Sequence, residues 1–126
     1  MAVTNRKRAS LEQYLNMPEL LARVENDREL LAELFALFQG HFPRLRDALR
    51  GAVDSCDPSQ AEKAAHTLKG MLANLSINRG AELAANVEAA ARAGDVQKIQ
   101  QAVALFDQEE AGLLEAVNLF ATGGKR

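Results

Sequence analysis

One short segment of this 126-residue chain combines residue types that suit phosphoryl chemistry. His66 precedes Lys69 by three residues and Gly70 by four, so the three share one face if the segment is helical. The neutral imidazole of an exposed histidine is a nucleophile, and a lysine one turn away can hold an anion attached to the ring. Glycine inside a helix costs about 1 kcal/mol relative to alanine, but it leaves room for another protein. The group therefore suits a phosphoryl acceptor.

The direction of the His66 ring follows from helical geometry. At about 100° per residue, the apolar positions between Pro58 and Leu75 fall on one side and predict a core face: Ala61, Ala65, Leu68, Leu72 and Leu75. His66 lies roughly 160° from the centre of that face, so its ring should point into solvent. The outer surface around it, which we expect to bind a partner, comprises Glu62, Lys63, Lys69, Gly70 and Ala73.

The rest of the chain predicts an all-α protein. Alanine and leucine, both strong helix formers, make up about a third of the sequence, and no segment shows sustained period-2 alternation. Short connections between helices favour an antiparallel up-and-down four-helix bundle, with a short extra N-terminal helix across one end. We expect the bundle over residues 10–121, a flexible tail or linker over 1–9, and a frayed C-terminus over 122–126.

Local signals mark the ends of the expected helices. A capping box at Ser10 and Gln13 should open the short first helix, and Met17-Pro18 should restart it. Asp57-Pro58 is a strong helix start, and Gly94-Asp95 is a stop followed by a cap. In the segment between these two signals, Ser76 and Asn78 mark a tight turn.

Two longer helices should supply most of the large core side chains. The first keeps its phase through Pro43, which predicts one kinked helix rather than two, along the stripe Leu31, Leu34, Phe38, Phe42, Leu45, Leu49 and Ala52. The last carries the stripe Val96, Ile99, Val103, Phe106, Leu113, Val117 and Phe120. Glu110 interrupts this second stripe, either as a carboxylate at the bundle edge or as a contact with a partner.

Composition excludes several function classes. The net charge is −2 and aromatic residues make up 5%, which argues against binding to nucleic acid. The single cysteine supports neither a disulfide nor a thiolate zinc site. We find no P-loop, glycine-rich nucleotide loop or acidic metal cluster, so we expect no bound cofactor or metal. With no apolar span or secretory signal, we expect a cytoplasmic protein without direct membrane contact. A bundle of this size needs no partner to close its core, so we expect a monomer.

A family resemblance rests on the segment around the histidine. His66-Thr67-Leu68-Lys69-Gly70, followed by Ala73-Asn74-Leu75, resembles the signature of histidine-containing phosphotransfer (HPt) domains. With the surrounding helix pattern, the similarity covers about residues 18–120. The sequence departs from the family pattern at Met71, where small residues are common, and at Ser76, where glycine is usual.

The resemblance implies a phosphocarrier without a nucleotide site of its own. It assigns His66 as the phosphorylated residue, Lys69 as the cation that holds the phosphoryl oxygens, and Gly70 as clearance for the partner. Glu88 matches a position that carries Gln or Glu near the histidine and could orient the ring. The partners would be receiver domains of response regulators or hybrid histidine kinases, which supply the aspartate and Mg²⁺.

Three alternatives stay open from the residues alone. One is the phosphoryl-accepting domain of a chemotaxis-type histidine kinase, which shares the bundle. Another is a sensor histidine kinase, although 126 residues leave no room for an ATP-binding domain. The third is a helical interaction bundle without phosphoryl chemistry, in which His66 is a surface residue like any other.

Overall fold

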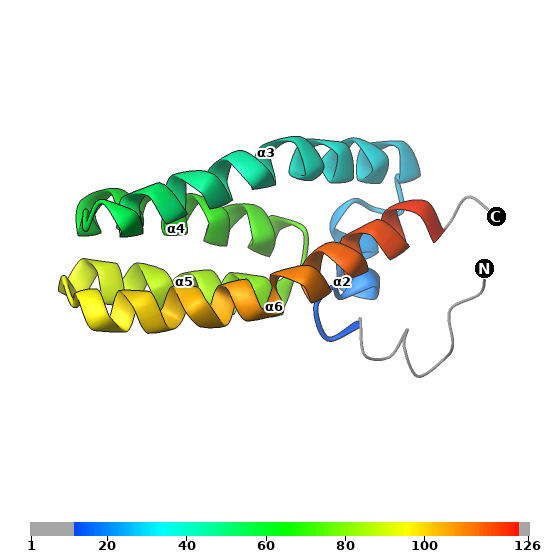
Figure 1. The fold of residues 1–126 in the computed structure, drawn as a ribbon. Helices are drawn as coiled ribbons and strands as arrows, with labels where there is room; N and C mark the ends of the chain where they lie inside the picture. Colours follow the sequence, from blue (N-terminus) through cyan, green and yellow to red (C-terminus); the bar gives the residue numbers. More distant parts are fainter. Residues whose placement is uncertain (1–11, 124–126) are drawn as a thin grey trace.

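A computed structural model describes residues 12–123 of the chain. Its elements are α2 (Met17–Arg23), α3 (Arg28–Asp54), α4 (Pro58–Asn74), α5 (Asn78–Ala93) and α6 (Val96–Gly123). Each of the last four helices packs on the next, and α6 returns beside α3 (Figure 1). The prediction of an all-α bundle is confirmed. None of the helices within this range combines the length and the apolar character that a membrane span requires.

Local capping explains where the helices begin. The side chain of Asp27 accepts a hydrogen bond from the backbone N–H of Leu30 at 3.0 Å, and this bond opens α3. Asp57 does the same for Gln60 at 3.2 Å, so α4 begins at Pro58 as predicted. Each carboxylate satisfies an N–H that has no partner inside its own helix. The capping box at Ser10 lies outside the described residues, as does the expected tail over 1–9.

The turn between α5 and α6 also follows the predicted signals. Gly94 adopts the left-handed conformation, with φ of 71°, and ends α5. The carboxylate of Asp95 then accepts from the backbone N–H of Lys98 at 3.1 Å and opens α6. That helix runs to Gly123, two residues beyond the end we expected for the bundle.

Helix α3 is continuous through Pro43, as its unbroken apolar phase predicted. Figure 1 shows its axis changing direction about halfway along, which is where proline removes a backbone hydrogen bond. The buried face differs from the predicted stripe in two ways. Phe35, which lies outside the stripe, is buried, and Leu34 and Leu45, which belong to it, are only half-buried. An apolar face of a core helix commonly spans more than one side-chain row.

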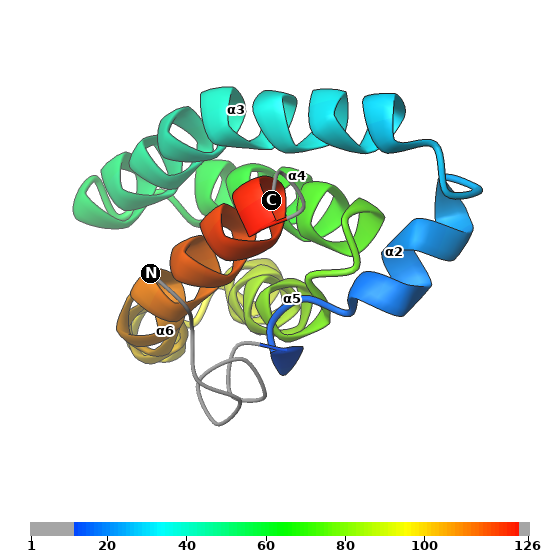
Figure 2. The same cartoon turned by 90° about the vertical axis from the view of Figure 1, so that its right-hand side faces the viewer.

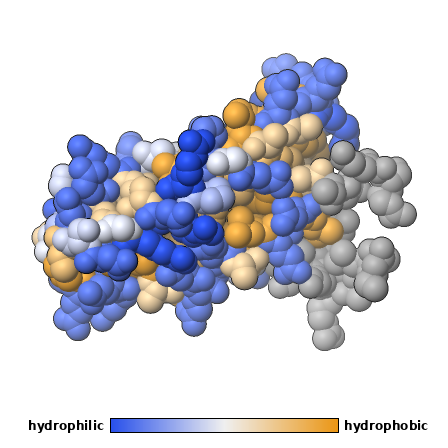
Figure 3. Space-filling view, turned by 45° about the horizontal axis from the view of Figure 1, so that its top comes forward, coloured by the Kyte–Doolittle hydropathy of each residue, from blue (hydrophilic) through white to orange (hydrophobic). Residues whose placement is uncertain are grey.

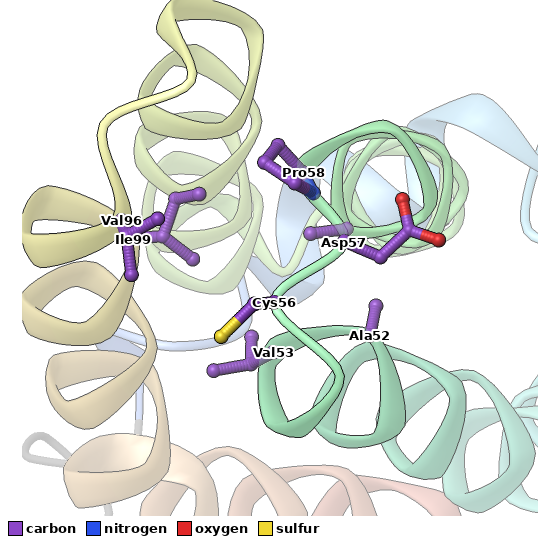
Figure 4. Close-up of a pocket in the computed structure, with 8 residues that line it drawn as sticks. Ala52, Val53, Cys56, Asp57, Pro58, Val96 and Ile99 are labelled. Carbon is purple, nitrogen blue, oxygen red and sulfur yellow. The ribbon is translucent and has the colours of Figure 1, made fainter.

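The stripe of α6 is buried from Ile99 to Val117 as predicted, but its first member, Val96, is exposed and its last, Phe120, is half-buried against the core. Val96 remains 42% exposed because it begins the helix at the end of the bundle. There it lines a small hollow with Ile99, Val53 and Cys56, at the turn between α3 and α4 (Figure 4). Glu110 is mostly buried and accepts a hydrogen bond from Arg46 of α3 at 2.6 Å, which places it in an ion pair at the α3–α6 edge.

Helix α2 lies at the end of the bundle where α3 begins and α6 ends (Figures 1 and 2). Leu15 and Leu20 are fully buried there and belong to the same core cluster as the large side chains of the bundle. The backbone N–H of Asn16 donates to the carbonyl of Ser76 at 3.0 Å, so this segment is tied to the α4–α5 turn. The short N-terminal helix therefore closes one end of the core.

Candidate functional site: an exposed histidine on a buried carboxylate

His66 lies in the middle of α4 with its ring directed outward. Its side chain is 67% exposed, while Ala65 and Leu68 beside it in sequence are fully buried. The five positions predicted for the core face of α4 are all buried. The direction of the ring is therefore the one that helical periodicity predicted.

Glu88 of α5 holds the ring from the neighbouring helix. Its carboxylate is only 5% exposed, and Oε2 lies 2.8 Å from Nδ1 of His66. An ionised carboxylate can only accept hydrogen bonds, so Nδ1 must carry the proton. In the neutral ring, Nε2 then keeps its lone pair. This contact fixes the orientation of the ring.

Lys69 is a second donor from α4 to the carboxylate of Glu88. Its Nζ lies 2.7 Å from Oε1 of Glu88. The ammonium is thus held one turn after His66, on the same carboxylate that holds the ring. The hydrogen bond from Lys69 lowers the pKa of Glu88 below its ordinary value, burial opposes that shift, and the hydrogen bond from His66 adds to the lowering. Glu88 is therefore an anion at neutral pH.

Close packing of small residues brings His66 and Glu88 together. Helices α4 and α5 form the most extensive contact in the bundle, and both helices carry alanine at many buried positions: Ala61, Ala64, Ala65, Ala84, Ala90 and Ala91. Small side chains let helix axes approach at the short end of the usual range of about 8–10 Å. A carboxylate on α5 can then reach a ring on the outer side of α4.

The surface after His66 is open. A Cβ added to Gly70 would meet no atom within 4 Å, and Ala73, one turn further on, is half-buried. Met71, the bulky departure from the family pattern, is partly buried and packs against the core cluster. The backbone at Gly70 is thus bordered by open space, and its role as clearance for a partner stays a prediction.

The surface before His66 is a shallow depression that includes Glu62, Lys63 and Ser59 of α4. Arg92 of α5 also lines it, and sequence reasoning missed this residue. Its Nη2 donates to Oε2 of Glu88 at 3.0 Å and its Nε to Oε2 of Glu62 at 2.9 Å. The available signal was the spacing of four residues between Glu88 and Arg92, which places both side chains on one face of a helix.

Two residues named with the family resemblance, Thr67 and Ser76, contact or shape only the nearby backbone. Thr67 donates its hydroxyl proton to the carbonyl of Lys63 at 3.1 Å, a bond within α4. Ser76, where glycine is usual in the family pattern, is fully buried with φ of 57°. The turn thus keeps a left-handed conformation that glycine adopts without steric strain.

Comparison with known proteins agrees with this geometry. The family model described as "Hpt domain" matches residues 29–118, from the first turn of α3 to the last part of α6. The match includes His66, Lys69, Gly70, Glu88 and Arg92, and leaves α2 outside. No curated protein and no solved structure gave a significant match. Because the matched segment covers most of the chain, the protein belongs to the Hpt domain family, whose members serve histidine phosphotransfer in phosphorelays.

Proposed function

We propose that His66 is the phosphorylated residue of this Hpt domain, and that it carries a phosphoryl group between receiver domains. The observation that supports this most strongly is the bond from Nδ1 of exposed His66 to the buried carboxylate of Glu88. It orients the ring and leaves Nε2 as the nucleophilic nitrogen.

The proposed step is a direct phosphoryl transfer from an aspartyl phosphate of the receiver. The lone pair of Nε2 attacks phosphorus, the N–P bond forms, and the P–O bond to the aspartate breaks with its electrons on the carboxylate. Nδ1 keeps its proton, and the ring becomes positively charged. Glu88, an anion 2.8 Å away, stabilises that developing charge. The reverse step delivers the group to another receiver.

The receiver supplies the other half of this chemistry, including its aspartate and Mg²⁺. Docking is proposed on the outer face of α4, where Gly70 leaves space around the ring and Glu62, Lys63 and Ala73 surround it. Lys69 is proposed to contact the phosphoryl oxygens. Its ammonium, 2.7 Å from Glu88, needs only rotation about its flexible stem to reach them.

The decisive test uses His66→Gln. A receiver charged with acetyl phosphate should label the wild-type chain and should leave the variant unlabelled, while far-UV circular dichroism shows the same helix content for both. ATP alone should label neither protein. Labelling of His66→Gln would show that another residue accepts the group, and labelling by ATP alone would favour a kinase. A wild-type chain that no receiver labels would support a helical interaction bundle.

A further inference from the structure

Arg92 forms a bridge between two carboxylates beside the candidate phosphoryl acceptor. The guanidinium donates from Nε to Glu62 of α4 at 2.9 Å and from Nη2 to Glu88 of α5 at 3.0 Å. The two acceptors differ sharply in environment, because the Glu88 side chain is 5% exposed and the Glu62 side chain 35% exposed. Arg92 itself is 65% exposed. Its bond to Glu62 is therefore a surface ion pair, whose net contribution is small.

The bridge lies next to the His66 ring. Nη2 of Arg92 and Nδ1 of His66 contact the same oxygen, Oε2 of Glu88, at 3.0 and 2.8 Å. The guanidinium and the ring therefore cannot be further apart than these two distances combined. Both also line the same shallow depression, together with Glu62. Because the Arg92 side chain is 65% exposed, it has room to rotate toward a substituent on the ring.

Phosphorylation changes the balance of charge at this place. A phosphoryl group adds about −1.5 to −2 charge and three strong acceptor oxygens. Arginine binds such a group through two parallel N–H bonds, which are stronger than a single bond to a solvated carboxylate. Glu62 and the phosphoryl group would then compete for one guanidinium. Glu88 is not an equal competitor, since it is buried and already accepts bonds from His66 and Lys69.

We propose that Glu62 holds Arg92 in the unphosphorylated domain, and that Arg92 exchanges Glu62 for the phosphoryl oxygens when His66 is phosphorylated. This inference rests on the proposed function of His66. Arg92 then stabilises phosphohistidine directly, whereas Glu62 acts through Arg92 as a positioning residue that opposes phosphorylation. The pair sets how readily the domain accepts the group and how readily it gives the group up.

The test measures the equilibrium constant between phosphorylated receiver and phosphorylated Hpt domain. An equilibrium constant does not depend on how fast two proteins dock, so a change in it reports the stability of phosphohistidine rather than surface complementarity. Glu62→Gln should shift the equilibrium toward phosphohistidine about two- to fivefold, the range of a surface ion pair. Arg92→Gln should shift it the other way by about tenfold, because charged hydrogen bonds are lost.

The double variant decides between this mechanism and a general charge effect. Because Glu62 acts through Arg92, Glu62→Gln should have no further effect when Arg92→Gln is already present. Glu82→Gln is a matched control, since Glu82 is an exposed carboxylate that pairs with Arg79 on the same helix α5. It should leave the equilibrium unchanged.

The outcomes separate the two proposals. If the wild-type chain and all variants except His66→Gln are labelled, but Glu62→Gln leaves the equilibrium unchanged, the exchange is wrong and the function stands. An equal shift in the single variant and on the Arg92→Gln background also overturns the exchange. If the wild-type chain takes no label from any receiver, the proposed function itself fails.

Discussion

Glu88 is the residue on which the site depends. Three donors from two helices meet on its carboxylate: His66 at 2.8 Å, Lys69 at 2.7 Å and Arg92 at 3.0 Å. A buried carboxylate is costly unless it is paired and hydrogen-bonded, and here both oxygens have partners. The same bonds that make its burial tolerable also orient the ring. The Glu88 carboxylate therefore both pairs the two helices and orients the His66 ring.

The lowered pKa of Glu88 predicts how its contribution to stability depends on pH. The hydrogen bond from Lys69 is the main cause, and it places the folded-state pKa below the ordinary value of 4.5. The unfolded chain binds a proton at higher pH than the folded chain does, so this contribution is complete above about 4.5 and is lost as the pH falls through the lower folded-state pKa. Glu88→Gln removes the carboxylate, so its free energy of unfolding should fall less steeply on acidification.

Urea unfolding followed by circular dichroism between about pH 3 and 7 measures this difference. Other carboxylates, including Glu109 beside Arg79, also titrate, but they are present in both proteins and cancel in the comparison. Glu33→Gln removes one exposed carboxylate from α3 and serves as the control. If Glu88→Gln and the wild-type chain lose stability in parallel, Glu88 is not held as a stabilised anion.

At the scale of elements, the α4–α5 hairpin sets the distance between ring and carboxylate. His66 and Glu88 are 22 residues apart in sequence, and the turn between their helices fixes how the two faces align. That turn has Ser76 at its centre, fully buried, with φ of 57°, and its carbonyl accepts the backbone N–H of Asn16. A residue with a Cβ in this conformation costs roughly 1–2 kcal/mol relative to glycine.

Ser76→Gly should therefore stabilise the fold. Relief of the left-handed strain exceeds the extra chain entropy that glycine loses, about 0.5–1 kcal/mol, so we expect a net gain of up to about 1 kcal/mol. Ser76→Ala removes the buried hydroxyl, which has no hydrogen-bond partner among the described residues, but it keeps the Cβ and the left-handed strain, so it should gain less than Ser76→Gly. Thermal unfolding of the wild-type chain and the two variants measures the order of their stabilities. A variant with glycine that unfolds at a lower temperature than the wild-type chain would show that the serine hydroxyl outweighs the strain.

At the scale of the whole molecule, the candidate site and the helix that closes the core lie in different places. His66 lies in the middle of α4, whereas α2 covers the end at which α3 begins (Figure 2). Figure 3 shows a face on which apolar side chains gather toward that same end. Exposed Leu30 and Leu37 belong to the first half of α3. The open space at Gly70, by contrast, lies one turn after His66, where the proposed function places the receiver.

Gly70→Leu tests whether encounter with a partner needs that access. A leucine side chain should obstruct the docking of a receiver and slow phosphoryl transfer at least about tenfold, which corresponds to about 1.4 kcal/mol. Stability should not fall, because glycine is the poorer helix former by about 0.8–1 kcal/mol. Stopped-flow transfer kinetics and urea unfolding measure the two effects.

Gly51→Leu is the matched control for this substitution. Gly51 also lies inside a helix, α3, and a Cβ there would meet no atom within 4 Å. It should gain the same stability and transfer at the wild-type rate. A normal rate for Gly70→Leu would mean that the partner approaches from another side.

The sequence by itself determined the helices and the outward direction of His66. Asp57-Pro58 and Gly94-Asp95 act on backbone groups within a few residues, so the helix ends that they set can be predicted from the sequence. The ring points outward because Leu68 and Leu72 must be buried and the helical period then places residue 66 opposite. These are local consequences of residue type and spacing.

Only the tertiary structure decided how deeply each face is buried and which side chains from α5 meet the ring and its neighbours. Exposure of Val96 and burial of Phe35 depend on where each helix ends and how it is rotated against its neighbours. Burial of Glu88 and the bridge from Arg92 to Glu62 require α4 and α5 to meet in one register. Contacts across 22 or 30 residues arise from helix packing, and packing is a property of the assembled core rather than of any segment.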